Sequence, residues 1–188
     1  MINRIINKIK TISRTKIIKY KYRNNILIKG KQRIPQDTNL IIEKGKINLG
    51  EQISIQSGVH LTAIDGGNLK IDDGCAINRN CIFISRNKIC INKNVILGPN
   101  VCIYDHDHEF SYEGIEKNKF RIGSVIIEEG CWIGANVTIL KNTHIGAFSI
   151  IGAGTVVGGV EIPPHSMVVA NRLLNIQEIR RKEISGAM

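Results

Sequence analysis

Residues 127–158 read IEEGCW IGANVT ILKNTH IGAFSI IGAGTV VG, and every group of six starts with Ile or Val. An α-helix repeats its buried face about every 3.6 residues and a simple strand every second residue, so neither explains this period. A sustained repeat of six is typical of a parallel β-helix, a solenoid of short strands and tight turns. We therefore expect each repeated aliphatic residue to point into the coil, with the small or β-branched residue four positions later beside it.

The same period runs less regularly through the earlier part of the chain. Three groups of six complete one triangular coil, so the repeat predicts an all-β solenoid of about five coils over residues 41–165. The earlier repeated residues fall into three sets: Ile47, Ile53 and Val59; Ile71, Ile77 and Phe83; Ile91, Leu97 and Ile103.

One long interruption separates Ile103 from Ile127, and the repeat is lost over residues 104–126. We expect this segment to protrude from the solenoid as a loop. Protruding loops on a rigid scaffold often carry the functional residues of a protein.

Charge is unevenly distributed along the 188 residues. The net charge is +10, yet residues 1–33 hold 11 Lys or Arg and no acid, and the remainder holds 15 basic against 16 acidic residues. The basic character therefore belongs to an N-terminal arm, assigned to residues 1–40. The body of the protein lacks the charge pattern of a nucleic-acid-binding domain.

Within this arm, isoleucines recur at helical spacing between basic residues. One interpretation is a basic amphipathic helix that lies on an anionic membrane surface. The other, which we favour, is a helix that packs on the solenoid or a neighbouring subunit and caps its open end. No signal peptide or membrane span is predicted, because Lys and Arg interrupt every apolar run. The isoleucines are Ile2, Ile5, Ile6, Ile9 and Ile12.

The repeat ends at Pro163-Pro164, and residues 166–188 form a separate C-terminal segment. Leu173, Ile176 and Ile179 follow a roughly helical spacing, which predicts a short helix packed on the last coil.

Five cysteines occur without a CxxC pair. Three of them, Cys75, Cys81 and Cys131, occupy the small-residue position of their repeats, where we expect buried thiols that pack as small hydrophobic groups. A reducing compartment suits free cysteines, so we expect a cytoplasmic protein, at the inner membrane surface if the arm binds lipid.

The loop begins with Tyr104-Asp105-His106-Asp107-His108-Glu109-Phe110, an unusual concentration of acids and histidines. Alternation places His106 and His108 on one side of an extended segment. A histidine titrates near neutral pH and can take a proton from an alcohol or amine. Three interpretations remain open at this point: a general base, a metal site, or a solvated polar loop.

Several stretches together resemble the hexapeptide-repeat acyltransferases, in particular the maltose/galactoside acetyltransferases and capsular-polysaccharide O-acetyltransferases. The resemblance covers about residues 41–171. It is carried by residues 91–101 (INKNVILGPNV), 105–108 (DHDH), 131–137 (CWIGANV), 151–154 (IGAG) and 162–164 (IPP).

This resemblance implies a left-handed β-helix that forms homotrimers, with each active site between two subunits. It also implies acetyl-CoA as the acyl donor, a saccharide hydroxyl or cell-surface glycan precursor as the acceptor, and no metal. His108 matches the catalytic histidine, which would deprotonate the acceptor hydroxyl during its attack on the thioester.

Other matched positions imply binding roles. Asn78, Asp105 and His106 would bind the acceptor, although Asn78 also suits a turn, and Asp105 and His106 equally suit the orientation of His108. The cofactor-binding set implied by the resemblance is Trp132, Gly134, Ala135, Gly152, Ala153 and Arg172.

The chain departs from the family where a lysine usually faces a CoA phosphate, because Gly158-Gly159 stands there instead. Arg172 would replace the lost charge, with Lys141 as the next candidate.

Three other functions stay open: N-acetylation of an amino-sugar nucleotide, a γ-carbonic-anhydrase-like metalloenzyme, and a non-catalytic scaffold. A metal site would draw on His106, His108 and His144, whose spacing does not match the carbonic anhydrase pattern.

Overall fold

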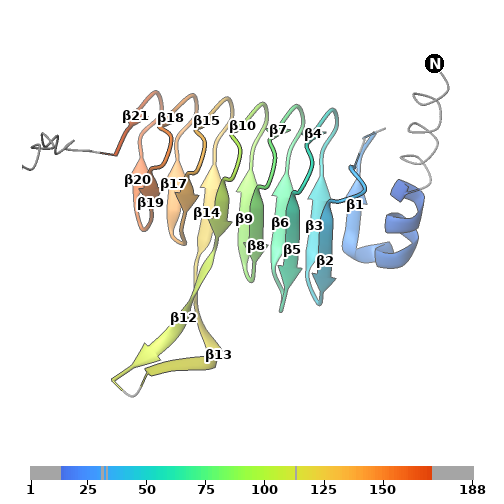
Figure 1. The fold of residues 1–188 in the computed structure, drawn as a ribbon, viewed down its shortest axis with the longest axis horizontal. Helices are drawn as coiled ribbons and strands as arrows, with labels where there is room; N and C mark the ends of the chain where they lie inside the picture. Colours follow the sequence, from blue (N-terminus) through green and yellow to red (C-terminus); the bar gives the residue numbers. More distant parts are fainter. Residues whose placement is uncertain (1–13, 31, 33, 113, 171–188) are drawn as a thin grey trace, which may run out of the picture.

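A computed structural model describes residues 14–30, 32, 34–112 and 114–170. Three parallel sheets run along a three-sided solenoid, and the chain passes through them in the order sheet 1, sheet 2, sheet 3 (Figure 1). Sheet 1 contains β1 (Ile26–Ile28), β3 (Lys46–Leu49), β6 (Asn68–Ile71), β9 (Lys88–Ile91), β14 (Ser124–Ile127), β17 (Thr143–Ile145) and β20 (Glu161–Ile162). Sheet 2 contains β4 (Ser54–Ile55), β7 (Ala76–Ile77), β10 (Ile96–Leu97), β15 (Trp132–Ile133), β18 (Ile150–Ile151) and β21 (Met167–Val168). Sheet 3 contains β2 (Asn39–Glu43), β5 (His60–Ile64), β8 (Ile82–Ser85), β11 (Cys102–Tyr104), β16 (Thr138–Ile139) and β19 (Val156–Val157).

The solenoid makes about seven turns, because sheet 1 has seven strands, and the estimate of five coils was too low. The additional turns lie at both ends. β1 and the first two residues of β2 fall in the segment that the sequence assigned to the N-terminal arm, and β21 lies beyond residue 165. Ile28, Ile34 and Leu40 are six residues apart, so the repeat does extend into this region without its usual glycines.

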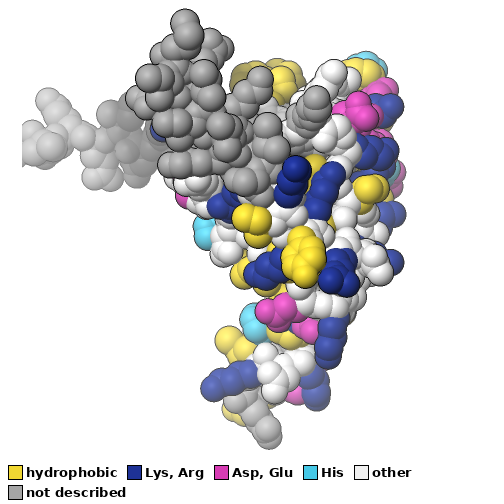
Figure 2. All heavy atoms as spheres, turned by 90° about the vertical axis from the view of Figure 1, so that its right-hand side faces the viewer, with side chains coloured by type: hydrophobic (Ala, Val, Ile, Leu, Met, Phe, Trp, Pro, Cys, Tyr) yellow, Lys and Arg dark blue, Asp and Glu magenta, His cyan; other side chains and the backbone are white. Residues whose placement is uncertain are grey.

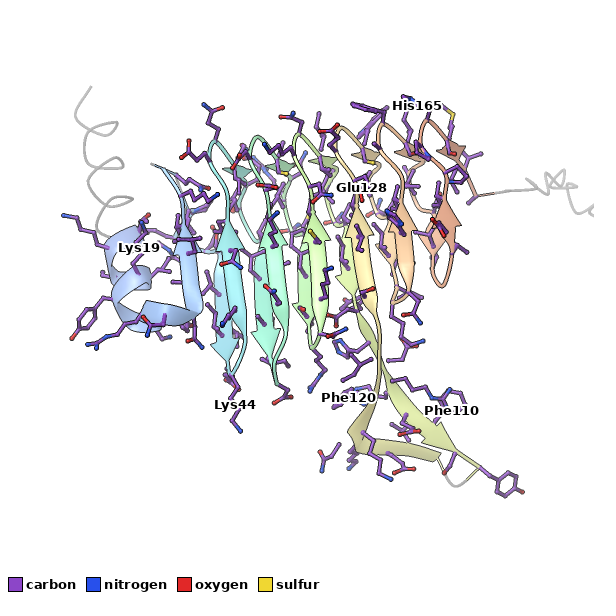
Figure 3. All side chains as sticks on the ribbon, turned by 180° about the vertical axis from the view of Figure 1, so that it is seen from behind. Lys19, Lys44, Phe110, Phe120, Glu128 and His165 are labelled. Carbon is purple, nitrogen blue, oxygen red and sulfur yellow. The ribbon has the colours of Figure 1, made fainter. Side chains whose placement is uncertain are left out.

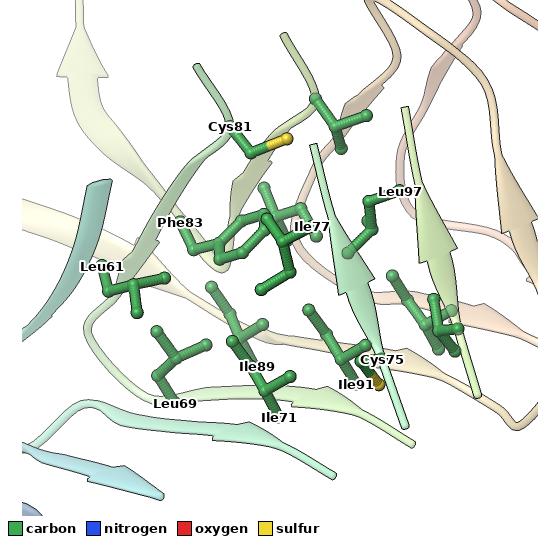
Figure 4. Packing of buried hydrophobic residues seen from close by; sticks show 14 of the residues in the cluster. Leu61, Leu69, Ile71, Cys75, Ile77, Cys81, Phe83, Ile89, Ile91 and Leu97 are labelled. Carbon is green, nitrogen blue, oxygen red and sulfur yellow. The ribbon is translucent and has the colours of Figure 1, made fainter. Parts of the chain in front are cut away.

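The repeated aliphatic residues stack in columns inside the solenoid. Ile71, Ile91 and Ile127 are paired in register across sheet 1 and are fully buried (Figure 4 shows the first two). The first predicted set was wrong by two residues. Ile47 pairs with Leu69, so the residues equivalent to the later anchors are Leu49, Ile55 and Leu61. Ile47 and Leu49 are both buried. In the sequence, only the glycine after Leu49 marks it as the equivalent of the later anchors.

Tight corners join the sheets. Asn136 and Gly154 occupy equivalent corner positions with φ of 57° and 68°, a left-handed conformation that Asn and Gly adopt most readily. Stacking of the coils brings these corners so close that a Cβ on Gly134 would lie 2.6 Å from the backbone nitrogen of Ala153. A glycine at position 134 is therefore required by the packing of successive coils.

The cysteines in the small-residue positions are buried, as predicted. Cys75, Cys81 and Cys131 are at most 1% exposed and belong to the hydrophobic core. Burial raises the pKa of the Cys75 and Cys81 thiols to about 11. These thiols therefore stay protonated at neutral pH and act as packing groups.

The N-terminal end of the solenoid is capped by a helix over residues 14–22, followed by the short 3₁₀ helix η1 (Arg23–Asn25). Ile18 joins the hydrophobic core and Tyr22 packs against it. A helix that packs on the end of the solenoid is therefore present in the arm at residues 14–22, after the isoleucines on which the capping prediction was based. The stripe Ile2–Ile12 and the predicted C-terminal helix lie outside the described residues.

The 104–126 interruption is a β-hairpin rather than an irregular loop. β12 (His106–Ser111) and β13 (Gly114–Ile122) pair antiparallel and project from the edge between sheets 3 and 1 (Figure 1). No helix among the described residues is long and apolar enough to cross a membrane.

Candidate active site

A buried carboxylate fixes the base of the hairpin. Asp105 has no exposed surface and accepts hydrogen bonds from Ser85 Oγ (2.7 Å) and from the backbone N–H groups of Arg86 (2.8 Å) and Asn87 (2.9 Å). His106 Nδ1 lies 2.9 Å from Oδ1, the carboxylate oxygen that also accepts the Arg86 N–H at 2.8 Å. Asp105 therefore has no surface to offer an acceptor. It holds the corner of the neighbouring coil and orients His106.

Burial of Asp105 opposes its charged form, but the hydrogen bonds from His106, Arg86, Ser85 and Asn87 outweigh it and keep the carboxyl pKa below its ordinary value. A depressed carboxyl pKa stabilises the fold above about pH 4, the unfolded value, and this stability is lost as pH falls through the folded pKa.

We expect the free energy of unfolding to decline below about pH 4, and the decline to be shallower in Asp105→Asn, which cannot ionise at this position. Chemical denaturation of both proteins between pH 3 and pH 7 measures this difference. Asp72 also has a lowered pKa, so a residual slope in the variant is expected. Parallel slopes in the two proteins would contradict a role for Asp105 ionisation.

Both candidate histidines contact one aromatic side chain of the opposite strand. His106 meets the ring of Phe120 edge-on at 5.5 Å between centroids, and His108 lies 4.7 Å from it at a tilt of 44°. The expectation that the two histidines share one side of the strand is therefore confirmed. The strand register shifts between His108 and Glu109. Such bulges redirect the side chains beside them, and here the shift follows the proposed base directly.

Phe120 is held in turn by the solenoid. The Arg86 guanidinium lies 3.6 Å from the centroid of the Phe120 ring and pairs with Asp65. Figure 3 shows Phe120 at the base of the hairpin and Phe110 further along it. His108 is exposed and keeps its access to solvent, while Phe120 and Arg86 restrict the position of its ring.

A second contact braces the hairpin. Lys141, in the corner after β16, lies 3.1 Å from the Asp107 carboxylate of β12. The sequence offers Lys141 as the second candidate partner of a CoA phosphate, and the structure pairs it with Asp107 at the corner beside the hairpin. Sequence reasoning missed Phe120, Arg86 and Lys141 as neighbours of the histidines, because 12 to 33 residues separate them from His108 and no local pattern marks them.

The predicted cofactor residues gather at another edge, between sheets 2 and 3. Trp132 on β15 is 54% exposed, and Gly134 and Ala135 form the corner that follows it. Gly152 and Ala153 occupy the same corner one coil further on. Because these residues are small, no large side chain keeps an extended ligand away from the backbone of this edge. Arg172 lies outside the described residues.

Asn78 lies at this same edge, after β7 of sheet 2, rather than beside His108. It is exposed, and its Oδ1 accepts a hydrogen bond from the Arg79 backbone N–H at 2.8 Å. The left-handed turn residue of this corner is Asn80, with a φ of 57°.

Within one chain the histidines and the cofactor residues are thus on different edges. The hairpin leaves at the edge between sheets 3 and 1, whereas Gly134 and Ala153 lie at the edge between sheets 2 and 3. His144 is on neither edge. Its Nε2 lies 3.1 Å from Glu128 on the outer face of sheet 1, on β17, the strand that pairs with β14 in the next coil. No group of three His, Cys, Asp or Glu among the described residues is arranged to hold a metal ion.

The chain has relatives among proteins named as acetyltransferases. The family profile for bacterial transferase hexapeptide (six repeats) matches residues 124–159. A Saccharomyces cerevisiae protein named as a putative acetyltransferase is 32% identical over 118 residues, which are 63% of this chain and 60% of the relative. A Staphylococcus aureus protein with the same description is 33% identical over 123 residues, 65% of this chain and 61% of the relative. The chain spans about three fifths of the length of these curated relatives.

Solved structures with the same solenoid agree with this similarity. A hexapeptide-repeat acetyltransferase of Vibrio cholerae, complexed with acetyl-CoA, is 28% identical with a TM-score of 0.58 and covers 68% of this chain and 67% of its own. A maltose O-acetyltransferase of Clostridium difficile is 25% identical with a TM-score of 0.50, covering 93% and 89%. The N-acyltransferase AntD of Bacillus cereus, with dTDP and coenzyme A, is 18% identical with a TM-score of 0.66, covers 88% and 89%, and shares the fold.

Proposed function

Because residues 124–159 match the hexapeptide transferase profile and the chain has the fold of the acetyltransferases above, we propose that it transfers an acetyl group from acetyl-CoA to a hydroxyl of a saccharide. The observation that carries the proposal is the hairpin. The hairpin projects an exposed His108 from the regular solenoid. The end of the hairpin nearest the solenoid is held in place by Asp105. A general base needs this combination of solvent access and restricted position.

In the proposed reaction, an imidazole nitrogen of His108 takes the proton of the acceptor hydroxyl. The oxygen then attacks the thioester carbonyl carbon, and the C–S bond breaks. The imidazolium returns its proton to the departing thiolate, so the products are the acetyl ester and the free thiol of CoA. No acyl-enzyme forms, and the raised pKa values of the buried cysteines agree with this.

The two edges of the chain support a shared site. His108 and the Trp132–Ala153 edge are separated by the full width of sheet 3, so neither is complete alone. We propose a homotrimer in which the hairpin of one subunit lies against the cofactor edge of its neighbour, as a closed cyclic assembly of identical interfaces would arrange it.

A thiol-release assay with acetyl-CoA tests the activity against free sugars, oligosaccharides and amino-sugar nucleotides. We expect release with a hydroxyl acceptor and an O-acetyl product in the mass spectrum. Preference for an amino-sugar nucleotide, with an N-acetyl product, would favour the N-acyltransferase function instead. No release with any acceptor would contradict the enzyme proposal.

Mixing two inactive variants tests the shared site. His108→Ala lacks the base, and Ala153→Trp fills the exposed cofactor edge with a bulky ring. If each site combines two subunits, random mixed trimers from coexpression should regain about a quarter of wild-type sites, since each site needs one intact contribution from each neighbour. Mixed protein as inactive as either parent would show that a site belongs to one chain.

A further inference from the structure

The capping helix has an inner face that is bound to the solenoid. Ile18 and Tyr22 follow Arg14 at intervals of four residues and therefore lie on one side of the helix. Arg14 Nη2 donates to the Thr38 carbonyl oxygen at 2.7 Å, and Tyr22 Oη donates to the Leu40 carbonyl oxygen at 2.7 Å. These contacts fix which side of the helix faces outward.

The outward side combines positive charge with exposed apolar groups. Ile17 is 64% exposed and Tyr20 is 74% exposed, although isoleucine is among the residue types most often buried and tyrosine is intermediate. Figure 2 views this end of the molecule and shows Lys and Arg side chains gathered around hydrophobic ones, and Figure 3 labels Lys19 on the cap. We call this surface the cap face. It consists of Lys16, Ile17, Lys19, Tyr20, Lys21 and Arg23.

The charge of the cap face is not neutralised locally. Residues 14–30 contain six Lys or Arg and no Asp or Glu. The ion pairs found among the described residues involve none of the cap-face cations. Two of them instead lie over tyrosine rings, with Lys21 Nζ 4.8 Å from the Tyr22 centroid and the Arg23 guanidinium 5.2 Å from that of Tyr20.

We propose that the cap face docks on an anionic lipid bilayer. The cations would face lipid headgroups, while Ile17 and Tyr20 would enter the interfacial layer, where aromatic and aliphatic side chains flanked by Lys and Arg are stabilised. A surface that binds its partner through positive charge alone, such as a site for nucleic acid, would not explain the two large apolar side chains exposed between the cations.

The position of the cap favours this partner. It lies at one end of the elongated solenoid, whereas a side-by-side trimer would use the sheet faces and edges (Figure 1). The proposed trimer would therefore present three cap faces in the same direction. Several weak contacts to one surface increase the total affinity strongly. Docking itself does not depend on the acetyltransferase proposal and is tested without substrate.

Vesicle flotation with the full chain tests this inference. We expect the protein to float with vesicles of phosphatidylcholine and 30% phosphatidylglycerol, to remain unbound with phosphatidylcholine alone, and to release as salt rises from 0.1 to 1 M, where the screening length falls from about 10 Å to about 3 Å. Lys16→Glu with Lys19→Glu should weaken binding at least 10-fold. Ile17→Ser with Tyr20→Ser should weaken it several-fold at the same charge.

Lys88→Glu with Lys93→Glu is the matched control. It changes the net charge by the same amount as the cap-face variant, but at exposed residues on the side of the solenoid. It should bind vesicles as the wild type does, and melting temperatures confirm that each variant is folded. Absence of wild-type flotation would overturn the proposal, as would equal losses in the cap-face and control variants. Unchanged binding by the serine variant would contradict insertion of Ile17 and Tyr20.

Discussion

His108→Ala is expected to lower kcat roughly 100-fold or more, the usual scale for loss of a general base. Its side chain is exposed on β12 and touches only Phe120 among the ring contacts, so the fold should be unaffected. The affinity for acetyl-CoA should change little, because the proposed base takes a proton from the acceptor hydroxyl and does not hold the donor. Steady-state kinetics and calorimetry with the donor separate the two effects.

His106→Ala provides the comparison, since it lies two residues away on the same side of the strand. Its Nδ1 is engaged with Asp105, so we expect a milder loss of turnover than for His108. Near-wild-type activity of His108→Ala, together with inactivity of His106→Ala, would assign the base to His106 instead.

Asp105→Ala is expected to destabilise the protein by on the order of 3 kcal/mol and to reduce kcat as well. Removing the carboxylate leaves buried donors of Ser85 and Arg86 unpaired, and an unsatisfied buried donor costs roughly 1–3 kcal/mol. The base of the hairpin then loses its attachment to the neighbouring coil, which displaces His106 and His108 together. Thermal or denaturant unfolding measures the stability, and kinetics below the melting range measures kcat.

Asp105→Asn is the matched variant, because it keeps the shape and one acceptor oxygen but no charge. It should retain more of both stability and turnover than Asp105→Ala. If Asp105→Ala melts with the wild type and turns over normally, the hairpin is held by other contacts, and Lys141–Asp107 and Arg86–Phe120 become the candidates.

The resemblance to a family and the pattern of the residues themselves predicted different parts of this site. The break in the repeat was sufficient to locate a protruding segment, and the alternation of His106 and His108 was sufficient to place both rings on one side. The family resemblance implied that Asp105 binds the acceptor or orients His108. The structure instead buries this carboxylate against Ser85 and Arg86, about twenty residues earlier, and such a contact leaves no local trace in the sequence.

The sequence by itself determined the solenoid, because a repeat of six leaves one arrangement that buries every repeated aliphatic residue of residues 127–158. It also indicated the buried cysteines, since coil stacking restricts the small-residue position of each repeat in the same way. Only the tertiary structure decided the phase of the first coils, where Ile47 and Leu49 are both buried. It also decided which edge each candidate site residue occupies and which side of the N-terminal helix faces outward. These features depend on contacts between coils. The spacing of the repeat along the chain does not say on which of the three sheets a given coil begins.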